Sequence, residues 1–151
     1  ALGLSEDERS EKLNVIINKE LADARRNYQQ MAKLVLESRA KINKILLRLG
    51  ESTAAAEEIG RDRSMPEQLA ALKDELENFQ KREEQRSIVI GAKKLAVQKL
   101  VTQLDEEVDA DFATSEELSV AFEARLDMYH IDVQKEQQKR KQELLTVLNG
   151  C

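Results

Sequence analysis

Few side chains in this sequence of 151 residues have the type and spacing that a reaction centre needs. The single histidine, His130, lies in a polar stretch with no serine or cysteine placed to form a nucleophile and base pair with it, so we interpret it as a surface residue. The single cysteine, Cys151, is the last residue. One histidine and one cysteine cannot form a Cys/His zinc site.

The densest group of potential cation ligands lies between residues 105 and 111. Its members are Asp105, Glu106, Glu107, Asp109 and Asp111. Their spacing is not that of an EF-hand loop, and the five glycines, at positions 3, 50, 60, 91 and 150, form no phosphate-binding loop. We therefore expect a protein that is not an enzyme and that needs no metal and no cofactor.

The composition predicts a helical fold. Charged residues make up 35% of the sequence and aromatic residues 3%, and five glycines and one proline are too few for the turns of a β or α/β fold. A net charge of −5 argues against nucleic-acid binding, and no apolar run is long enough for a membrane span. A helix lying on a membrane would need a basic face opposite aromatic residues, and the mixed charges do not fit that pattern. A single cysteine excludes an intrachain disulfide and fits a reducing compartment such as the cytoplasm.

The elements that such a chain offers are long helices. Ser5 to Glu8 form a capping box, and nothing breaks a helix from there to Gly50, so the first helix is predicted over residues 5–49. Apolar residues recur along it in steps of four and three, which is typical of a coiled-coil seam. The seam positions are Leu13, Ile17, Leu21, Ala24, Tyr28, Met31, Val35, Ser38, Ile42, Ile45 and Leu49.

Two further helices follow, over residues 65–108 and 115–148. A joint at 50–64, with at most one helical turn in its alanine-rich part, precedes the capping box of Ser64 to Glu67. Glu83, Arg86 and Lys93 fall on the seam of the second helix, so either the register shifts there or that stretch is solvated. A second joint at 109–112 precedes a capping signal at residues 114–117. The polar tract at 134–143 is either solvent-bridging or a neck.

Short joints favour antiparallel neighbours. The sequence therefore predicts one all-α module over residues 1–151, made of elongated antiparallel coiled-coil hairpins of three long helices, and a dimeric helical bundle. The residues predicted to pack these helices together are Val35, Ile42, Ile45, Leu49, Leu69, Leu72, Leu76, Phe79, Val97, Leu100, Leu104, Leu118, Phe122 and Tyr129.

The first helix carries more apolar surface than one antiparallel neighbour covers, because Ile16, Leu34, Leu46 and Leu47 lie beside its main seam. A second copy of the chain is the simplest cover. We assign the dimer contact to Leu13, Ile16, Ile17, Leu21, Tyr28 and Met31. The alternative is that these residues only face the second and third helices. The first helix is also basic, with a net charge of +3, which suits either two acidic neighbours within the chain or an acidic partner.

The start of the sequence resembles a known family. Residues 2–9 (LGLSEDER) open a very long helix, as does a similar element near the N-terminus of the antiparallel-microtubule cross-linkers. These are the animal protein regulator of cytokinesis, the yeast anaphase spindle elongation protein and the plant microtubule-bundling homologues. The order that follows is similar too: residues 46–51 (LLRLGE) end the first helix, 100–104 (LVTQL) end the second, and 115–118 (SEEL) open the third.

The resemblance implies a piece of a larger protein that lacks the tryptophan before the family's opening element. It implies an antiparallel homodimer, the start of a rod, and a place in the cytoskeleton at the spindle midzone during cytokinesis. It also implies recruitment of a midzone kinesin, or of centralspindlin through its Rho-GTPase-activating subunit. Microtubules would be bound only by a C-terminal domain that this sequence does not match. The alternative is a generic coiled-coil tether or scaffold of another cytoskeletal or trafficking protein.

Overall fold

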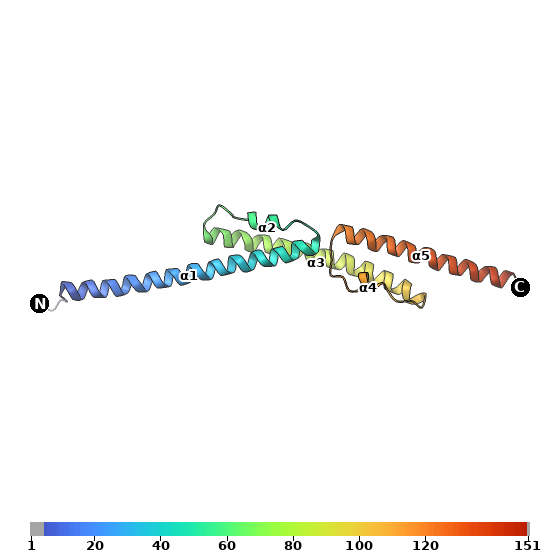
Figure 1. Ribbon diagram of the computed structural model, residues 1–151, viewed down its shortest axis with the longest axis horizontal. Helices are drawn as coiled ribbons and strands as arrows, with labels where there is room; N and C mark the ends of the chain where they lie inside the picture. Colours follow the sequence, from blue (N-terminus) through green and yellow to red (C-terminus); the bar gives the residue numbers. More distant parts are fainter. Residues whose placement is uncertain (1–4, 151) are drawn as a thin grey trace.

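The computed structural model describes residues 5–150, and every element within that range is a helix. Its elements are α1 (Glu6–Leu49), α2 (Ala54–Glu58), α3 (Met65–Gln103), α4 (Ala110–Ala113) and α5 (Val120–Asn149). Figure 1 shows an elongated molecule with the two ends of the chain at opposite ends of the long axis. The prediction of an all-α fold is confirmed. The first three residues of the family-like opening element, residues 2–4, lie outside the described residues.

The three long helices run in the same direction, and the prediction of antiparallel neighbours is wrong. Arg39 of α1 bonds to Gln68 near the start of α3, and Arg48 at the end of α1 pairs with Glu83 further along α3. The same order holds between α3 and α5, where Arg86 pairs with Glu123 and Gln103 bonds to Gln137. Figure 1 shows the reason: the segments containing α2 and α4 run back along the molecule before the next long helix begins. These joints are therefore crossover connections and not tight turns.

Serine side chains begin each long helix. The hydroxyl oxygens of Ser5, Ser64 and Ser119 accept hydrogen bonds from the amides of Glu8, Glu67 and Phe122, respectively. Each bond satisfies an amide that has no partner within the helix. The first two caps are those that the sequence predicts.

The bounds of the last two long helices differ from the prediction. α5 begins at Val120 and not near 115, because the Ser115 hydroxyl accepts from Glu117 in a local turn and leaves the cap to Ser119. α3 ends at Gln103 and not at 108, because Asp105 adopts a left-handed backbone conformation with a φ of 56°. A side chain other than glycine is strained there, so the helix cannot continue through it.

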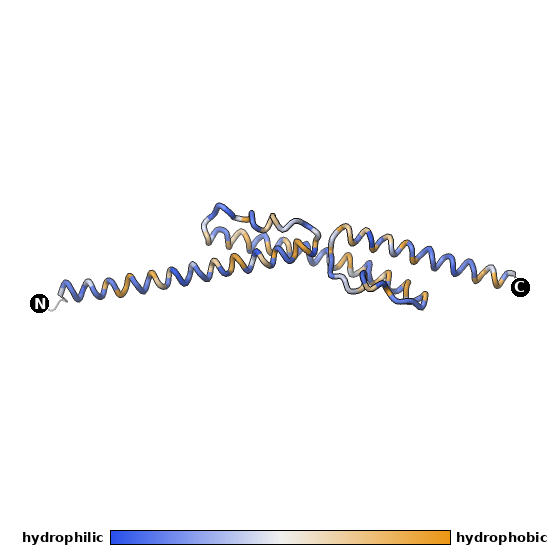
Figure 2. The backbone as a smooth tube through the Cα atoms, viewed as in Figure 1, coloured by the Kyte–Doolittle hydropathy of each residue, from blue (hydrophilic) through white to orange (hydrophobic). Residues whose placement is uncertain are grey.

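The core runs along α3 as two buried clusters. In its first half, Val35, Ile42 and Leu46 of α1 pack with Leu72 of α3 and Ala56 of α2. The second half is a separate buried cluster that ends on α5; its members are Ile45, Leu49, Ile90, Val97, Val101, Leu118, Phe122, Leu126 and Val133. Leu76 and Phe79 pack against both clusters, and Figure 2 shows the apolar residues of the helices along this line.

Helices α1 and α5 follow one another along α3. The amide of Leu118, just before α5, donates to the carbonyl of Arg48 in the last turn of α1 at 2.7 Å. Gly50 closes α1 with a φ of 71°, and a Cβ at this position would lie 2.8 Å from the Cβ of Ser119. Only glycine therefore allows the end of α1 to approach the start of α5 this closely. The result is a parallel two-stranded coil in which one strand is α3 and the other is α1 followed by α5.

The strand formed by α1 and α5 extends past α3 at both ends. Val35 packs in the same cluster as Met65, so α3 begins near Val35 and leaves α1 largely uncovered over Glu6–Leu34, where only Met31 and Ala32 are partly buried. We call this segment the overhang. At the other end, Arg140 bonds to the carbonyl of Leu104, and α5 continues beyond it with Leu144, Leu145, Val147 and Leu148 exposed.

Candidate functional site

The residues assigned to a dimer contact lie together on the overhang of α1. Leu13, Ile16, Ile17, Leu21 and Tyr28 are between 44% and 56% exposed, and Met31 is partly buried. All residues from Ser5 to Gln30 are exposed, so no described part of the chain covers this face. The alternative that these side chains face the second and third helices therefore does not describe the single chain. Val15, at 67% exposure, adds to the same apolar surface and is not among the assigned residues.

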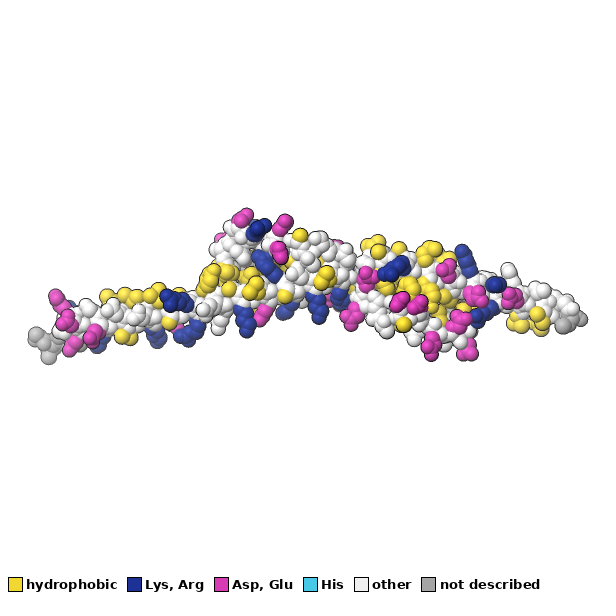
Figure 3. Space-filling model, in the orientation of Figure 1, with side chains coloured by type: hydrophobic (Ala, Val, Ile, Leu, Met, Phe, Trp, Pro, Cys, Tyr) yellow, Lys and Arg dark blue, Asp and Glu magenta, His cyan; other side chains and the backbone are white. Residues whose placement is uncertain are grey.

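The exposed face continues the seam that is buried further along the same helix. Tyr28 and Met31 lead into Val35, which packs against the start of α3. Figure 3 shows apolar side chains along one side of the overhang and basic side chains along the other. This pattern is typical of one strand of a coiled coil, and no described helix packs against its exposed part.

The overhang also carries a charge gradient. Its first two turns hold Glu6, Asp7, Glu8 and Glu11 against a single base, Arg9. From residue 12 to residue 34, five basic residues stand against two acidic ones. Figure 3 shows the acidic side chains at the tip and the basic ones further along α1. Two such helices side by side interact differently in the two possible orientations.

The residues predicted to pack the helices together all lie in the core. Eight of them are buried: Val35, Ile42, Ile45, Leu49, Leu72, Val97, Leu118 and Phe122. The other six are partly buried against the same clusters: Leu69, Leu76, Phe79, Leu100, Leu104 and Tyr129.

Six further core residues are not in the list of packing residues given above: Leu46, Ala56, Ile90, Val101, Leu126 and Val133. Leu46, Ala56 and Val101 are each at most 1% exposed. The interpretation of Leu46 as surplus surface is wrong, because the α2 segment folds back over α1 and covers a second face of that helix. The apolar positions next to the main seam are the available signal, but they do not say which element covers them.

The polar residues on the seam of α3 form ion pairs with residues of α1 and α5. The register of the seam does not shift at these positions. Glu83 pairs with Arg48 of α1 at 3.4 Å, and Arg86 pairs with Glu123 of α5 at 2.6 Å. Arg86 also donates to the carbonyl of Leu118 at 3.0 Å. Ile90 and Val97 remain buried on either side of Lys93, so the seam is continuous. These ion pairs hold the point where α1 ends and α5 begins.

Lys93 and Glu123 perturb each other's protonation. Hydrogen bonds to Asp127, at 2.9 Å, and to Glu123 hold the pKa of Lys93 above its usual value. Hydrogen bonds from Lys93 and then Arg86 hold the pKa of Glu123 below its usual value. Both shifts favour the charged forms, and therefore favour the docking of α5 onto α3 near neutral pH.

Replacing Glu123 with glutamine is expected to lower the melting temperature at pH 7 by about 3–6 °C, because Arg86 and Lys93 lose their shared partner. Since the pKa of Glu123 is lowered in the folded state, its contribution is present at neutral pH and is lost as the pH falls through that lowered pKa. The variant should therefore lose less stability than the native chain between pH 5 and pH 2 in circular-dichroism melts. Asp132→Asn, an exposed carboxylate with no described ion pair, is the matched control. Equal acid sensitivity of Glu123→Gln and the native chain would contradict this role.

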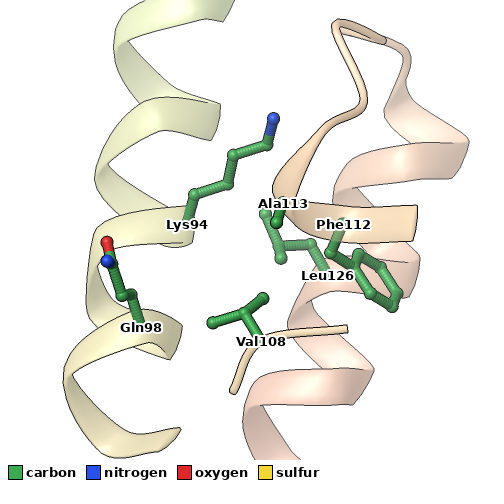
Figure 4. A pocket seen from close by; sticks show the side chains of 6 residues that line it. All are labelled: Lys94, Gln98, Val108, Phe112, Ala113 and Leu126. Atoms are coloured by element: carbon green, nitrogen blue, oxygen red, sulfur yellow. The ribbon is translucent and has the colours of Figure 1, made fainter. Parts of the chain in front are cut away.

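A hollow lies between α3, α5 and the connection that carries α4. The hollow in Figure 4, about 260 Å³, is lined by Lys94 and Gln98 of α3, by Leu126 of α5 and by the apolar residues Val108, Phe112 and Ala113. Lys94 is its single charged residue, and its ammonium donates to the carbonyl of Ser115 at 2.5 Å. Between residues 5 and 150, no three acidic, histidine or cysteine side chains are grouped to hold a metal ion. Of the acidic residues between 105 and 111, Glu106 pairs with Arg140 at 2.6 Å.

None of the helices described has the length and apolar character of a membrane span. Comparison with known proteins adds no assignment: no family model, no curated protein and no solved structure matches the chain. The exposed seam of the overhang is therefore the feature of the molecule on which a functional proposal rests.

Proposed function

We propose that this chain is a non-enzymatic homodimerisation and rod module, in which two copies pair through their α1 overhangs in antiparallel orientation. The observation that carries the proposal is the exposed apolar seam from Leu13 to Tyr28, which leads through the partly buried Met31 into the buried seam of the same helix. A helix of this length with an apolar face gains little stability from its own hydrogen bonds in water. Burial of the face against a second helix supplies the missing stabilisation.

A second copy suits this surface because both copies carry the same apolar seam and can pack these seams against each other. A twofold contact needs one self-complementary patch, and a coiled-coil seam of this kind is one. Val15 and Ile16 widen the apolar surface beyond a narrow two-helix seam, which gives the partner helix more area to cover.

Charge favours the antiparallel orientation. In a parallel pair, Glu6, Asp7 and Glu8 of both copies would lie together, and Arg25 and Arg26 would face their counterparts. In an antiparallel pair, the acidic tip of each copy lies beside the basic part of the other. Opposite charges then face each other at both ends of the contact.

We propose further, from the resemblance of residues 2–9 and 115–118, that the module belongs to a microtubule-bundling protein of the anaphase spindle midzone. An antiparallel dimer points its two filament-binding ends in opposite directions, as a cross-linker of antiparallel filaments requires. Continuous packing along α3 gives each arm stiffness. A midzone kinesin or centralspindlin would be the recruited partner, and the microtubule-binding domain would lie elsewhere in the protein.

Light scattering coupled to size exclusion tests the dimer. A chain of 17.2 kDa should give a mass of about 34 kDa at tens of micromolar, and a mass of one chain would contradict the proposal. Co-sedimentation with microtubules tests the wider role. The module alone should remain in the supernatant, and strong co-sedimentation would contradict the assignment of filament binding to another domain.

A further inference from the structure

We infer that, in the dimer, the acidic tip of one copy's α1 docks end to end against the start of α3 in the other copy, where Arg61, Arg63 and Lys33 receive it. The inference rests on the proposed dimer and adds its register and its electrostatic contact. In this arrangement, α3 of one copy and α1 of the other copy lie end to end and together form one strand with a break between them.

The path of the seam directs the partner's helix toward α3. The apolar positions of α1 run without a break from the overhang to the part buried against α3. A helix that covers the exposed part must therefore lie in line with α3. α3 begins beside Val35 and occupies the seam from there on, so the partner's helix must end at that point.

The length of the overhang brings the tip to that point. The overhang from Glu6 to Leu34 is about 44 Å long at 1.5 Å of rise per residue. Two overhangs of equal length that overlap completely place residues 6–8 of one copy beside residues 32–34 of the other. The tip then stands directly before Met65, the first residue of α3.

This chain already joins two helices end to end on a common strand. At the end of α1, the carbonyl of Arg48 accepts the amide of Leu118, and Gly50 lies against Ser119. A basic side chain of the neighbouring strand holds that junction, since Arg86 donates to the carbonyls of Leu118 and Ser119. The proposed junction also places two helices end to end on a common strand, but it joins two amino ends, so charges on the side chains take the place of the backbone bond.

The charges on the two sides of the proposed junction are complementary. Arg61 and Arg63 are exposed just before α3 and have no ion pair with any described residue, while Lys33 lies 4.0 Å from Glu37. Asp62 and Glu67, which lies in the first turn of α3, offset part of this positive charge, and the amino end of α3 adds to it. Two helix amino ends that meet would repel each other. The acids in the first turn of α1, at residues 6–8, reverse the sign at the tip.

Charge reversal tests the contact in the full chain by dimer dissociation at low ionic strength. Arg61→Glu with Arg63→Glu should weaken the dimer about tenfold, and Glu6→Lys with Glu8→Lys should weaken it by a similar factor. The combined four-site variant should return to within about twofold of the native chain, because the pairs are restored with opposite sign. Lys139→Glu with Lys141→Glu, on the exposed far end of α5, makes the same charge change away from the contact and should have no effect.

The combined variant separates this contact from helix stability, because lysines in the first turn of α1 weaken that helix in any arrangement and only an intermolecular pair gives rescue. A dimer that none of these reversals weakens, or a combined variant weakened by the product of the two separate effects, would overturn the docking while leaving the dimer intact. A native chain that is monomeric would overturn both proposals.

A cysteine pair gives a second readout. In a Cys151→Ser background, a mixture of Asp7→Cys and Asp62→Cys chains should form a disulfide between different copies. Neither chain alone should form it at the same rate. Absence of the mixed disulfide in a sample shown to be dimeric would also overturn the docking.

Discussion

Replacing both Ile17 and Leu21 with glutamate is expected to convert the dimer to a monomer. The dissociation constant of the dimer should rise at least about a thousandfold. In an antiparallel pair these residues lie near the centre of the contact, and each substitution acts on both copies. The variant would place four carboxylates in the apolar seam, where association would remove them from water. In the single chain both side chains are already exposed, at 44% and 53%, so the fold of the monomer should not change.

The matched control places the same charges on the overhang but off its seam. Ala22 and Gln29 are exposed and lie seven residues apart, one position after Leu21 and Tyr28. Ala22→Glu with Gln29→Glu should leave the mass in solution unchanged. If both double variants stay dimeric, or both become monomeric, the seam is not the site of association.

Replacing Phe122 with alanine is expected to lower the free energy of unfolding by about 3–5 kcal/mol, the largest effect of a single substitution in this chain. Phe122 is 2% exposed, its ring centre lies 5.8 Å from that of Phe112, and the ammonium of Lys94 lies 5.4 Å from it. The side chain therefore joins α5 to α3 and to the connection that carries α4. Its loss removes apolar contact from all three.

The damage should be local to the α5 half. Hydrogen exchange should accelerate in α5 and in the second half of α3, whereas the segment around Ile42 and Leu72 should keep its protection. Val120→Ala, at a neighbouring position that is 74% exposed, is the control and should cost little. Uniform loss of protection along the chain would show that the two buried clusters do not open separately.

The seam residues can be predicted well from the sequence because burial follows periodicity. The steps of four and three along α1 are a local property, and a helix with that pattern must bury the face wherever a neighbour exists. The same reasoning places Phe122 and Val97 in the core. It also identifies the serine caps of α1 and α3, since a cap depends on residues within one turn.

The direction of the helices cannot be predicted in the same way. It depends on whether a joint turns back at once or runs along the helix it has just left, and both paths fit the composition of residues 50–64. In the structure, Arg39 holds the returning segment by bonds to the carbonyls of Ala56 and Ile59. An arginine four residues after Val35 on α1 gives no sign in the sequence of such distant partners.

The role of the polar seam residues also cannot be predicted from the sequence. Arg86 and Lys93 interrupt an apolar pattern, and such interruptions are equally typical of a solvated stretch. Their partner, Glu123, lies on a different helix, so only the packing of α5 onto α3 shows the pairing. The same limit applies to Ser119, because Ser115 offers an equally good local cap.

Distances between spin labels on α1 show directly whether two copies meet through antiparallel overhangs. In a Cys151→Ser background, a label at position 22 lies near the centre of the predicted contact, and a label at position 41 lies far along α1 from it. We expect a distance of about 20–30 Å between the two labels at position 22, and of about 60 Å between the two at position 41. Short distances at both positions would show a parallel pair, and no distance at position 22 in a dimeric sample would show that the overhangs do not meet.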